Sequence, residues 1–429
     1  MVIWGENMDH RHKEKRQQFY EGIQDFWPDL CNQEYALYDI KVESKAQIDK
    51  IRLATGRVGH IFFKTARLMR HLDDETLLRL GFQKKMLSYI RLQTIAMETV
   101  VSRMEFAVNK RSVKLLTLHA NTPLLIKESF SVNGDVCSHF NVLNPNAGLE
   151  EDLQKALRSA ISYTKGYVGK GRNANIVFTS YEKSLEDYLT TQYLMKVANT
   201  EAQYLPFSDL RLIEQSLSGN KEVLFKAGLY DPKGDYVDIL LQRNQFSTSA
   251  SKVGKMEHMV MSFVESGVLG IINPPSAFLL QSNAVQALIW GLHEETHPYF
   301  TKKEHTWIAR YFVPTYMEED YFKKNNVKYV EKDLFSRESG AGQIGVTGGE
   351  GWIGKEMKKQ SVYQKHVDLP SHEVKTTEGL KVVNVLYSCF LVNGKPSAVS
   401  ILAKKNPGDH CDYYLPIGVE HPVEENKEE

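Results

Sequence analysis

The order of short apolar segments along the chain constrains the fold more than any other feature of the sequence. From Arg103 onward, segments typical of buried strands alternate with segments of helical periodicity. NIVFTSY is followed by the helical pattern SLEDYLTTQYLMKVA, and LGIINPP is followed by AVQALIWGL. This alternation favours layers of helices packed against sheets, in an α/β or α+β fold.

The two ends of the chain differ from this middle part. Residues 1–100 are mostly helical in pattern, and KAQIDKIRLATGRVGHIFFKTARLMRHL predicts a helix with one buried face. The C-terminal part is rich in strand patterns, and Asn393-Gly394 between two of them predicts a tight hairpin. A second hairpin is predicted around the turn 109–112.

Composition excludes several classes of partner. Lys+Arg and Asp+Glu both total 53, so no global field attracts nucleic acid or an anionic membrane. The N-terminal sequence lacks the apolar core of a signal peptide, and no apolar run approaches the ~18 residues that span a bilayer. The four cysteines are far apart in sequence, which is typical of a reducing compartment. We therefore expect a cytoplasmic protein.

A glycine-rich loop follows the strand pattern YVEK and suggests a phosphate site. Seven glycines lie between Gly340 and Gly354. Glycines let backbone N–H groups close around phosphate oxygens, and Lys332 on the strand could neutralise their charge. The alternative is a hairpin tip without a ligand.

Two nucleotide-binding motifs match this loop only in part. Gly340, Gly342 and Gly345 fit G-x-G-x-x-G, but no helical pattern follows them, as a dinucleotide site requires. The stretch from Gly349 to Lys355 fits the spacing of a P-loop but continues with Glu rather than Ser or Thr.

The sequence HEETH raises the hypothesis of a zinc hydrolase. His293 and His297 have the spacing of two zinc ligands on one helical turn, and Glu294 is placed to activate water. Pro298 follows at once and disfavours helical geometry at the residue before it. We therefore expect His297 at or beyond the end of the helix, with His305 as the nearby candidate for a third ligand.

A set of longer segments in fixed order resembles the glutathionylspermidine synthase family of ATP-grasp ligases. The segments are INPPSAFLLQS, AVQALIWGL, YVEK-LFSRE, YQKHVDLP and FLVNGKPSAVSI, preceded by SRMEF, VKLL, HANTP and SLEDYLTTQYL. The resemblance runs from about Arg103 to Gly418. It implies an α+β ATP-grasp fold in three parts: a helical N-terminal segment (1–100), a pre-ATP-grasp, substrate-side region (101–270) and an ATP-grasp nucleotide-binding region (271–429).

The resemblance also implies an activity, cofactors and site residues. Such enzymes use ATP and Mg²⁺ to phosphorylate a peptide-like carboxylate, and an amine then displaces the phosphate to form an amide. The implied catalytic residue is Arg103, and Glu105 is the implied metal ligand. The implied nucleotide-binding residues are Lys332, Arg337, Glu338, Gly340, Gly342, Gln364 and Lys365.

The chain departs from the family at charged positions. Thr117 and His119 occupy the places of a glutamate and an asparagine that hold metal, although Mg²⁺ prefers oxygen ligands. The uncharged side chains Asn283, Gln242 and Leu402 stand where the family has basic residues, and Arg243 is one place away from its expected position.

Two functional hypotheses follow. The chain is either an active C–N ligase for peptide-like and amine small molecules, or a non-catalytic pseudo-ligase that binds or regulates, as a homodimer or beside an active paralogue. Phosphoryl transfer depends on positioning and charge neutralisation, and each lost electrostatic group costs on the order of 100- to 1000-fold in rate. Several neutral replacements in one site therefore favour weakened or lost activity.

Overall fold

The computed structural model describes nine stretches of the chain. They are residues 2–169, 173–181, 184–214, 216–217, 223–243, 252–335, 343–345, 360–405 and 412–421. The mixture of helices and sheets confirms the predicted α+β, ATP-grasp-like class, and the helical N-terminal segment is present. Within the described residues, none of the helices combines the length and apolarity that a membrane crossing requires.

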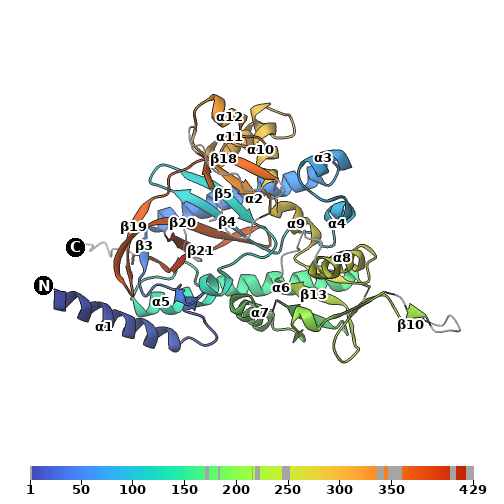
Figure 1. The fold of residues 1–429 in the computed structure, drawn as a ribbon, viewed down its shortest axis with the longest axis horizontal. Coiled ribbons are helices and arrows are strands. Elements are labelled where there is room, and N and C mark those ends of the chain that lie inside the picture. Colours follow the sequence, from blue (N-terminus) through green and yellow to red (C-terminus); the bar gives the residue numbers. More distant parts are fainter. Residues whose placement is uncertain are drawn as a thin grey trace, which may run out of the picture.

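A six-stranded antiparallel sheet forms the centre of the molecule (Figure 1). Its order is β22-β21-β20-β4-β5, with β19 paired to β20. The strands are β4 (Val101–Val108), β5 (Val113–His119), β19 (Ser371–Thr376), β20 (Gly379–Val392), β21 (Lys395–Lys404) and β22 (Tyr413–Leu415). The sheet thus joins strands from the two regions predicted at 101–270 and 271–429, and the domain boundaries themselves stay predictions.

Both predicted hairpins are confirmed in this sheet. In the turn between β4 and β5, the Asn109 side chain accepts hydrogen bonds from the backbone N–H groups of Arg111 and Ser112. Between β20 and β21, Asn393 and Gly394 both have positive φ, at 46° and 76°. Positive φ at both central residues is the requirement of the type I′ turn, which Asn-Gly favours.

Helices cover both faces of the central sheet. On one face lies α2 (Lys45–Met69), which begins with Ser44 as N-cap and buries its apolar stripe against β20 and β21. Gly59 of α2 allows this close approach, since an added Cβ would lie 2.8 Å from Leu391 Cδ2. On the other face lie the π-helical turn η2 (Glu128–Val132) and α6 (Leu149–Tyr167).

A parallel sheet of order β14-β13-β6-β7 lies beside α6. Its strands are β6 (Ile176–Thr179), β7 (Gln203–Tyr204), β13 (Ile239–Gln242) and β14 (Gly270–Ile272). The predicted helix after NIVFTSY is confirmed as α7 (Leu185–Ala198), with the Ser184 side chain capping the N–H of Asp187. α8 (Lys252–Glu265) precedes β14.

A third sheet carries the strand that precedes the glycine-rich loop. Its order is β15-β18-β16-β17, with β15 (Thr315–Tyr316), β16 (Tyr329–Asp333), β17 (Gln343–Gly345) and β18 (Ser361–Lys365). α10 (Ala284–Glu294) packs against β15, and α11 (Lys302–Tyr311) packs against α10 and α2. Figure 1 shows this sheet and its helices at the top, on the opposite side of the central sheet from α6 and α7.

The remaining elements are short or peripheral. The helices are α1 (Val2–Glu21), α3 (Asp74–Arg79), α4 (Leu87–Arg91), α5 (Asn133–His139), α9 (Pro275–Gln281), α12 (Asp320–Lys324), η1 (Lys84–Met86) and η3 (Phe207–Asp209). The strands are β1 (Asp29–Leu30), β2 (Gln33–Glu34), β3 (Lys41–Glu43), β8 (Arg211–Ile213), β9 (Ser216–Leu217), β10 (Val223–Phe225), β11 (Gly228–Tyr230), β12 (Tyr236–Val237) and β23 (Ile417–Val419).

The contact between β14 and α6 yields a first prediction. An added Cβ at Gly270 would lie 2.1 Å from Thr164 Cγ2, so Gly270→Ala overpacks this contact. We expect a loss of about 1–3 kcal/mol in the free energy of unfolding, measured by urea denaturation. Gly291→Ala is the matched control, because nothing lies within 4 Å of its added Cβ. It should be neutral or stabilise α10 by up to about 1 kcal/mol. Equal stability of the two variants would contradict the prediction.

Candidate functional site

Strand pairing places Arg103, Glu105 and His119 on one face of the central sheet. In the antiparallel pairing of β4 and β5, Arg103 lies opposite His119 and Glu105 lies opposite Thr117. Residues two apart on a strand point to the same face, so all four side chains share it. Phe390 is paired with Arg103 and packs edge-on against Phe130 of η2, so this is the face turned away from α2.

The three ionisable side chains on this face form a compact, buried cluster. Arg103 Nη2 donates to Glu105 Oε1 over 2.7 Å, and His119 Nε2 lies 3.1 Å from the same oxygen. Each residue is at most 1% exposed. Burial alone raises the pKa of the Glu105 carboxyl, but His119 and Arg103 outweigh it and hold that pKa well below its usual range. Burial lowers the pKa of His119. The carboxylate is therefore ionised and neutralised by the guanidinium of the protein itself.

This arrangement does not fit a magnesium ion. Mg²⁺ requires near-octahedral oxygen ligands and is bound through carboxylates. Glu105 is the one carboxylate at the predicted metal position, and one of its oxygens is already paired with Arg103. Within the described stretches, no three His, Cys, Asp or Glu side chains lie close enough together to hold a metal ion.

Thr117 is engaged with Asn283, the residue that replaces a family lysine. The Thr117 hydroxyl donates to Asn283 Oδ1 over 3.3 Å, and Asn283 Nδ2 donates to the Asp333 carbonyl over 2.8 Å. Asn283 precedes α10, and Asp333 ends β16. These neutral contacts therefore tie the central sheet to the third sheet.

Lys332 lies next to this contact, with its ammonium group bound to the protein. Its Nζ donates to the Leu116 carbonyl over 2.9 Å and to Gln364 Oε1 over 2.6 Å. Gln364 Nε2 is in turn 3.1 Å from Gln286 Oε1. Burial lowers the pKa of Lys332 to about 8. Two residues of the predicted nucleotide set, Lys332 and Gln364, are thus brought together.

The lowered pKa of Lys332 predicts how the free energy of unfolding changes with pH. An unfolded lysine titrates near 10.5, so between pH 8 and 10.5 the unfolded chain binds a proton that the folded chain has released. The free energy of unfolding therefore rises with pH in this window through Lys332. We expect a flatter pH profile for Lys332→Met than for the wild type, measured by urea denaturation from pH 7 to 10.5. Parallel profiles would contradict the shift, and Lys302→Met, at an exposed lysine, provides the control.

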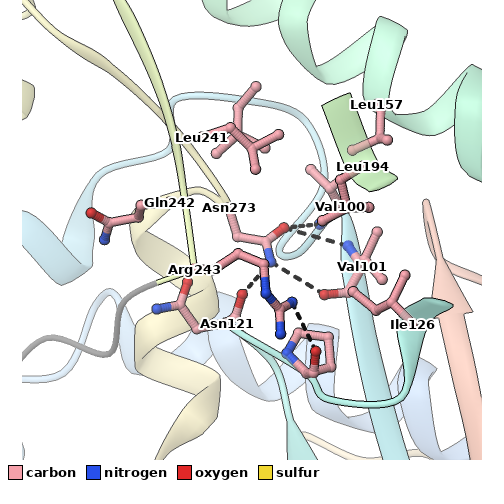
Figure 2. A pocket seen from close by; sticks show the side chains of 12 residues that line it. Val100, Val101, Asn121, Ile126, Leu157, Leu194, Leu241, Gln242, Arg243 and Asn273 are labelled. Atoms are coloured by element: carbon pink, nitrogen blue, oxygen red, sulfur yellow. Dashed lines mark hydrogen bonds between the residues drawn. The ribbon is translucent and has the colours of Figure 1, made fainter. Parts of the chain in front are cut away.

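Gln242 and Arg243 line a small pocket at the carboxyl end of β13 (Figure 2). The Arg243 side chain is 3% exposed; its Nη1 donates to the Pro123 carbonyl over 2.9 Å, and its Nη2 lies 3.4 Å from Asp187 Oδ1. The cavity measures about 30 Å³, which is room for one or two water molecules. Within the described residues, the Arg243 guanidinium therefore contacts other groups of the protein, Pro123 and Asp187.

The remaining predicted residues are placed as follows. Lys365 is exposed at the end of β18, with its backbone N–H bonded to the Pro314 carbonyl. Leu402 is opposite Tyr414 and packs into the apolar layer between the sheet and α6. Four residues lie outside the described residues and stay predictions: Arg337, Glu338, Gly340 and Gly342.

The HEETH segment does not have the geometry of a zinc motif. α10 ends at Glu294, and His297 lies beyond it, with its N–H bonded to the Leu292 carbonyl. His293 instead faces His305, with 3.0 Å between their Nδ1 atoms. The expected position of His297 is confirmed, and the two histidines of the motif do not share a helical turn.

Two residues of this site were not identified from the sequence. Gln286 is a buried amide in the apolar helix α10, and Ser388 is a buried hydroxyl in the apolar strand β20. A single polar side chain within an apolar run is the signal that could have marked both.

Comparisons with known proteins agree with this fold. The family model "Glutathionylspermidine synthase preATP-grasp" matches residues 8–408. A glutathione synthetase-like effector (GSS30) from Globodera pallida, solved in its apo form, is similar in fold. It has a TM-score of 0.58 and 10% identity, with 95% of this chain and 96% of that chain covered.

A second solved structure is more distant. A gamma-glutamylcysteine synthetase-like protein from Methylobacillus flagellatus KT has a TM-score of 0.36 and 9% identity, covering 85% of this chain and 86% of its own. No curated protein sequence matches the chain.

Proposed function

The chain belongs to the glutathionylspermidine synthase pre-ATP-grasp family, and from this premise we propose that it is a non-catalytic member of that ATP-grasp ligase family. In this proposal the ancestral activity, ATP-dependent ligation of a peptide-like carboxylate to an amine, is lost. The protein serves as a binding or regulatory module in the cytoplasm, as a homodimer or beside an active paralogue.

One observation carries the proposal. The Glu105 carboxylate is neutralised by the Arg103 guanidinium over 2.7 Å, at the position where the family places its metal-binding acids. Thr117, which replaces the second acid, carries no charge, and its hydroxyl donates a hydrogen bond to Asn283. Without charge-neutralising metal ions, the negative charge that develops during phosphoryl transfer has little stabilisation, and this step depends almost wholly on such stabilisation.

The contacts around the other implied groups support the same proposal. Lys332 is held by Leu116 and Gln364, and Arg243 is held by Pro123 and Asp187. Moving either side chain onto a phosphate would break hydrogen bonds inside the protein. The geometry therefore favours a rigid scaffold over a site that gathers charge around a triphosphate.

A turnover assay tests the proposal. Purified full-length protein is incubated with ATP, Mg²⁺ and mixtures of peptides and polyamines, and ADP is measured with and without these substrates. We expect no substrate-dependent ADP above the level of a Lys332→Ala variant. Substrate-dependent ADP that disappears in Lys332→Ala would overturn the proposal.

An active C–N ligase is the second candidate function. Its support is the position of Lys332 on β16, directly before the glycine-rich loop, with a pKa lowered by burial to about 8. Arg103 and Glu105 also occupy the positions that the family uses. The assay above separates the two candidates, because a working ligase forms ADP in proportion to amide product.

A further inference from the structure

Basic side chains gather on the surface where α2 and α11 pack together. On α2, Lys50, Arg57 and Lys64 follow one another at intervals of seven residues, so they lie on one side of the helix. On α11, Lys303 and Arg310 have the same spacing, and both are exposed. With Lys114 of β5 these residues form a basic ridge, which we define as Lys50, Arg57, Lys64, Lys114, Lys303 and Arg310.

Two lysines of the basic ridge are held by backbone carbonyls. Lys114 Nζ donates to the Ala309 and Phe312 carbonyls over 3.0 and 3.1 Å, at the C-terminal end of α11. Lys50 Nζ donates to two carbonyls of the β4–β5 turn over 3.1 and 3.2 Å. Within the described stretches, Lys64 is the ridge residue that is paired with a carboxylate, Glu304, over 2.8 Å.

Two aromatic rings position the other ridge cations. The Arg57 guanidinium lies 5.5 Å from the centre of the Trp307 ring, and its Nη1 donates to the Tyr311 hydroxyl over 2.9 Å. Lys303 Nζ lies 5.3 Å from the centre of the Trp307 ring, and the Arg310 guanidinium lies 5.6 Å from that of Tyr311. A cation over a ring keeps N–H groups available to an anion. Because these cations are already positioned, less conformational freedom is lost when an anion binds.

The positive charge of the basic ridge exceeds what the protein neutralises there. Glu304 is the carboxylate that pairs with the ridge among the described residues, and His60 shares it with Lys64. The whole chain contains equal numbers of acidic and basic residues, so this excess is local. Clustered like charges repel one another and destabilise the compact state. An anionic partner would remove this repulsion.

The aromatic rings distinguish between two kinds of anionic partner. Surfaces that bind single-stranded nucleic acid combine basic groups with aromatic rings on which bases stack. Here the Trp307 and Tyr311 rings are already in contact with Arg57, Lys303 and Arg310. Carboxylates need no stacking surface, and a guanidinium binds them through two parallel hydrogen bonds. The basic ridge therefore favours carboxylates over nucleobases.

We propose that the basic ridge is a docking surface for an acidic segment of a partner protein, rich in aspartate and glutamate. Carboxylates of this segment pair with Arg57 and Arg310, and the ridge lysines attract and orient the segment. The basic ridge contains no residue of the candidate functional site. This inference therefore goes beyond the proposed function and holds with or without turnover of ATP.

Fluorescence anisotropy of a labelled deca-glutamate peptide, titrated with the full-length protein, tests the docking surface. A labelled oligo-uridine of the same length is the second arm. We expect saturable binding of deca-glutamate at low ionic strength, weaker binding of oligo-uridine, and loss of affinity as salt screens the charges. The double variant Lys303→Gln/Arg310→Gln should bind deca-glutamate about 10-fold more weakly than the wild type.

The double variant Lys155→Gln/Lys233→Gln is the matched control. Lys155 of α6 and Lys233 in the turn between β11 and β12 are exposed and lie outside the basic ridge. The control removes the same net charge as the ridge variant, so it should bind deca-glutamate as the wild type does. All four substituted side chains are exposed, and both variants should remain folded, as measured by thermal unfolding.

Three results would overturn the docking surface. Absence of saturable binding of deca-glutamate at low ionic strength would remove the partner. Tighter binding of oligo-uridine than of deca-glutamate would assign the basic ridge to nucleic acid instead. Equal loss of affinity in the ridge variant and the control variant would show that net charge, rather than this surface, attracts the peptide. None of these measurements depends on ATP, so they are independent of the turnover assay for the proposed function.

Discussion

Replacing Glu105 with glutamine lowers the free energy of unfolding by about 3–5 kcal/mol. The substitution preserves the shape of the side chain but removes the charge that neutralises Arg103, which is 1% exposed. Breaking a buried ion pair from one side leaves the other charge uncompensated, and this is among the most costly single changes. Urea denaturation at pH 7 measures the loss, and the exposed Glu295→Gln serves as control and should stay within about 0.5 kcal/mol.

The double variant Arg103→Met/Glu105→Leu sharpens this test. Both charges are then removed together, and apolar side chains of similar volume replace them. Such replacements are often neutral or stabilising, so the double variant should be more stable than Glu105→Gln alone. If Glu105→Gln lowers the free energy of unfolding by less than about 1 kcal/mol, Glu105 is not the main counter-charge of Arg103. Such a result would point instead to Glu128 as the counter-charge. Burial raises the pKa of Glu128, and a hydrogen bond with Tyr35 and the charges of Arg243 and Arg103 offset only part of this rise.

Thr117→Glu combined with His119→Asn makes the stability of the protein depend on Mg²⁺. The new carboxylate stands directly opposite Glu105, so the metal-free variant contains two opposed like charges in a buried place. The pair of carboxylates and the new amide oxygen form the ligand type that Mg²⁺ prefers. Saturation at 100 times the dissociation constant would add about 2.7 kcal/mol to the free energy of unfolding.

Thermal unfolding with and without Mg²⁺ measures this effect. We expect the double variant to be less stable than the wild type in EDTA and to recover part of the loss as Mg²⁺ is added. His119→Asn alone is the control, since it removes the imidazole without adding a second carboxylate. Equal stabilisation of the wild type by Mg²⁺ would contradict the conclusion that its side chains do not fit the metal.

Local features of the structure were predictable from short stretches of sequence. The Asn393-Gly394 turn and the hairpin after β4 depend on residues that tolerate or stabilise tight turns, and both are confirmed. The position of His297 beyond the helix end follows from the proline after it. The ordered family segments likewise gave the fold class, which the family match over residues 8–408 confirms.

The contents of the site were only partly predictable. The resemblance to the family implied that Arg103, Glu105, Thr117 and His119 belong to one site, and the pairing of β4 with β5 places them on one face. It gave no indication that Glu105 would be paired with Arg103 rather than left open for a metal. Two side chains on the same strand face can contact each other or point apart, and the packing around them decides which occurs.

What the sequence by itself determined is therefore the set of turns, the helix ends and the family. Only the tertiary structure decided that Ser388 lies beside Glu105 and that Lys332 is bound to Leu116 and Gln364. The physical reason is that strand register and burial are set by contacts between segments far apart in the chain. Burial also sets the charge state, since the same lysine has a pKa near 10.5 in the unfolded chain and about 8 in the folded protein.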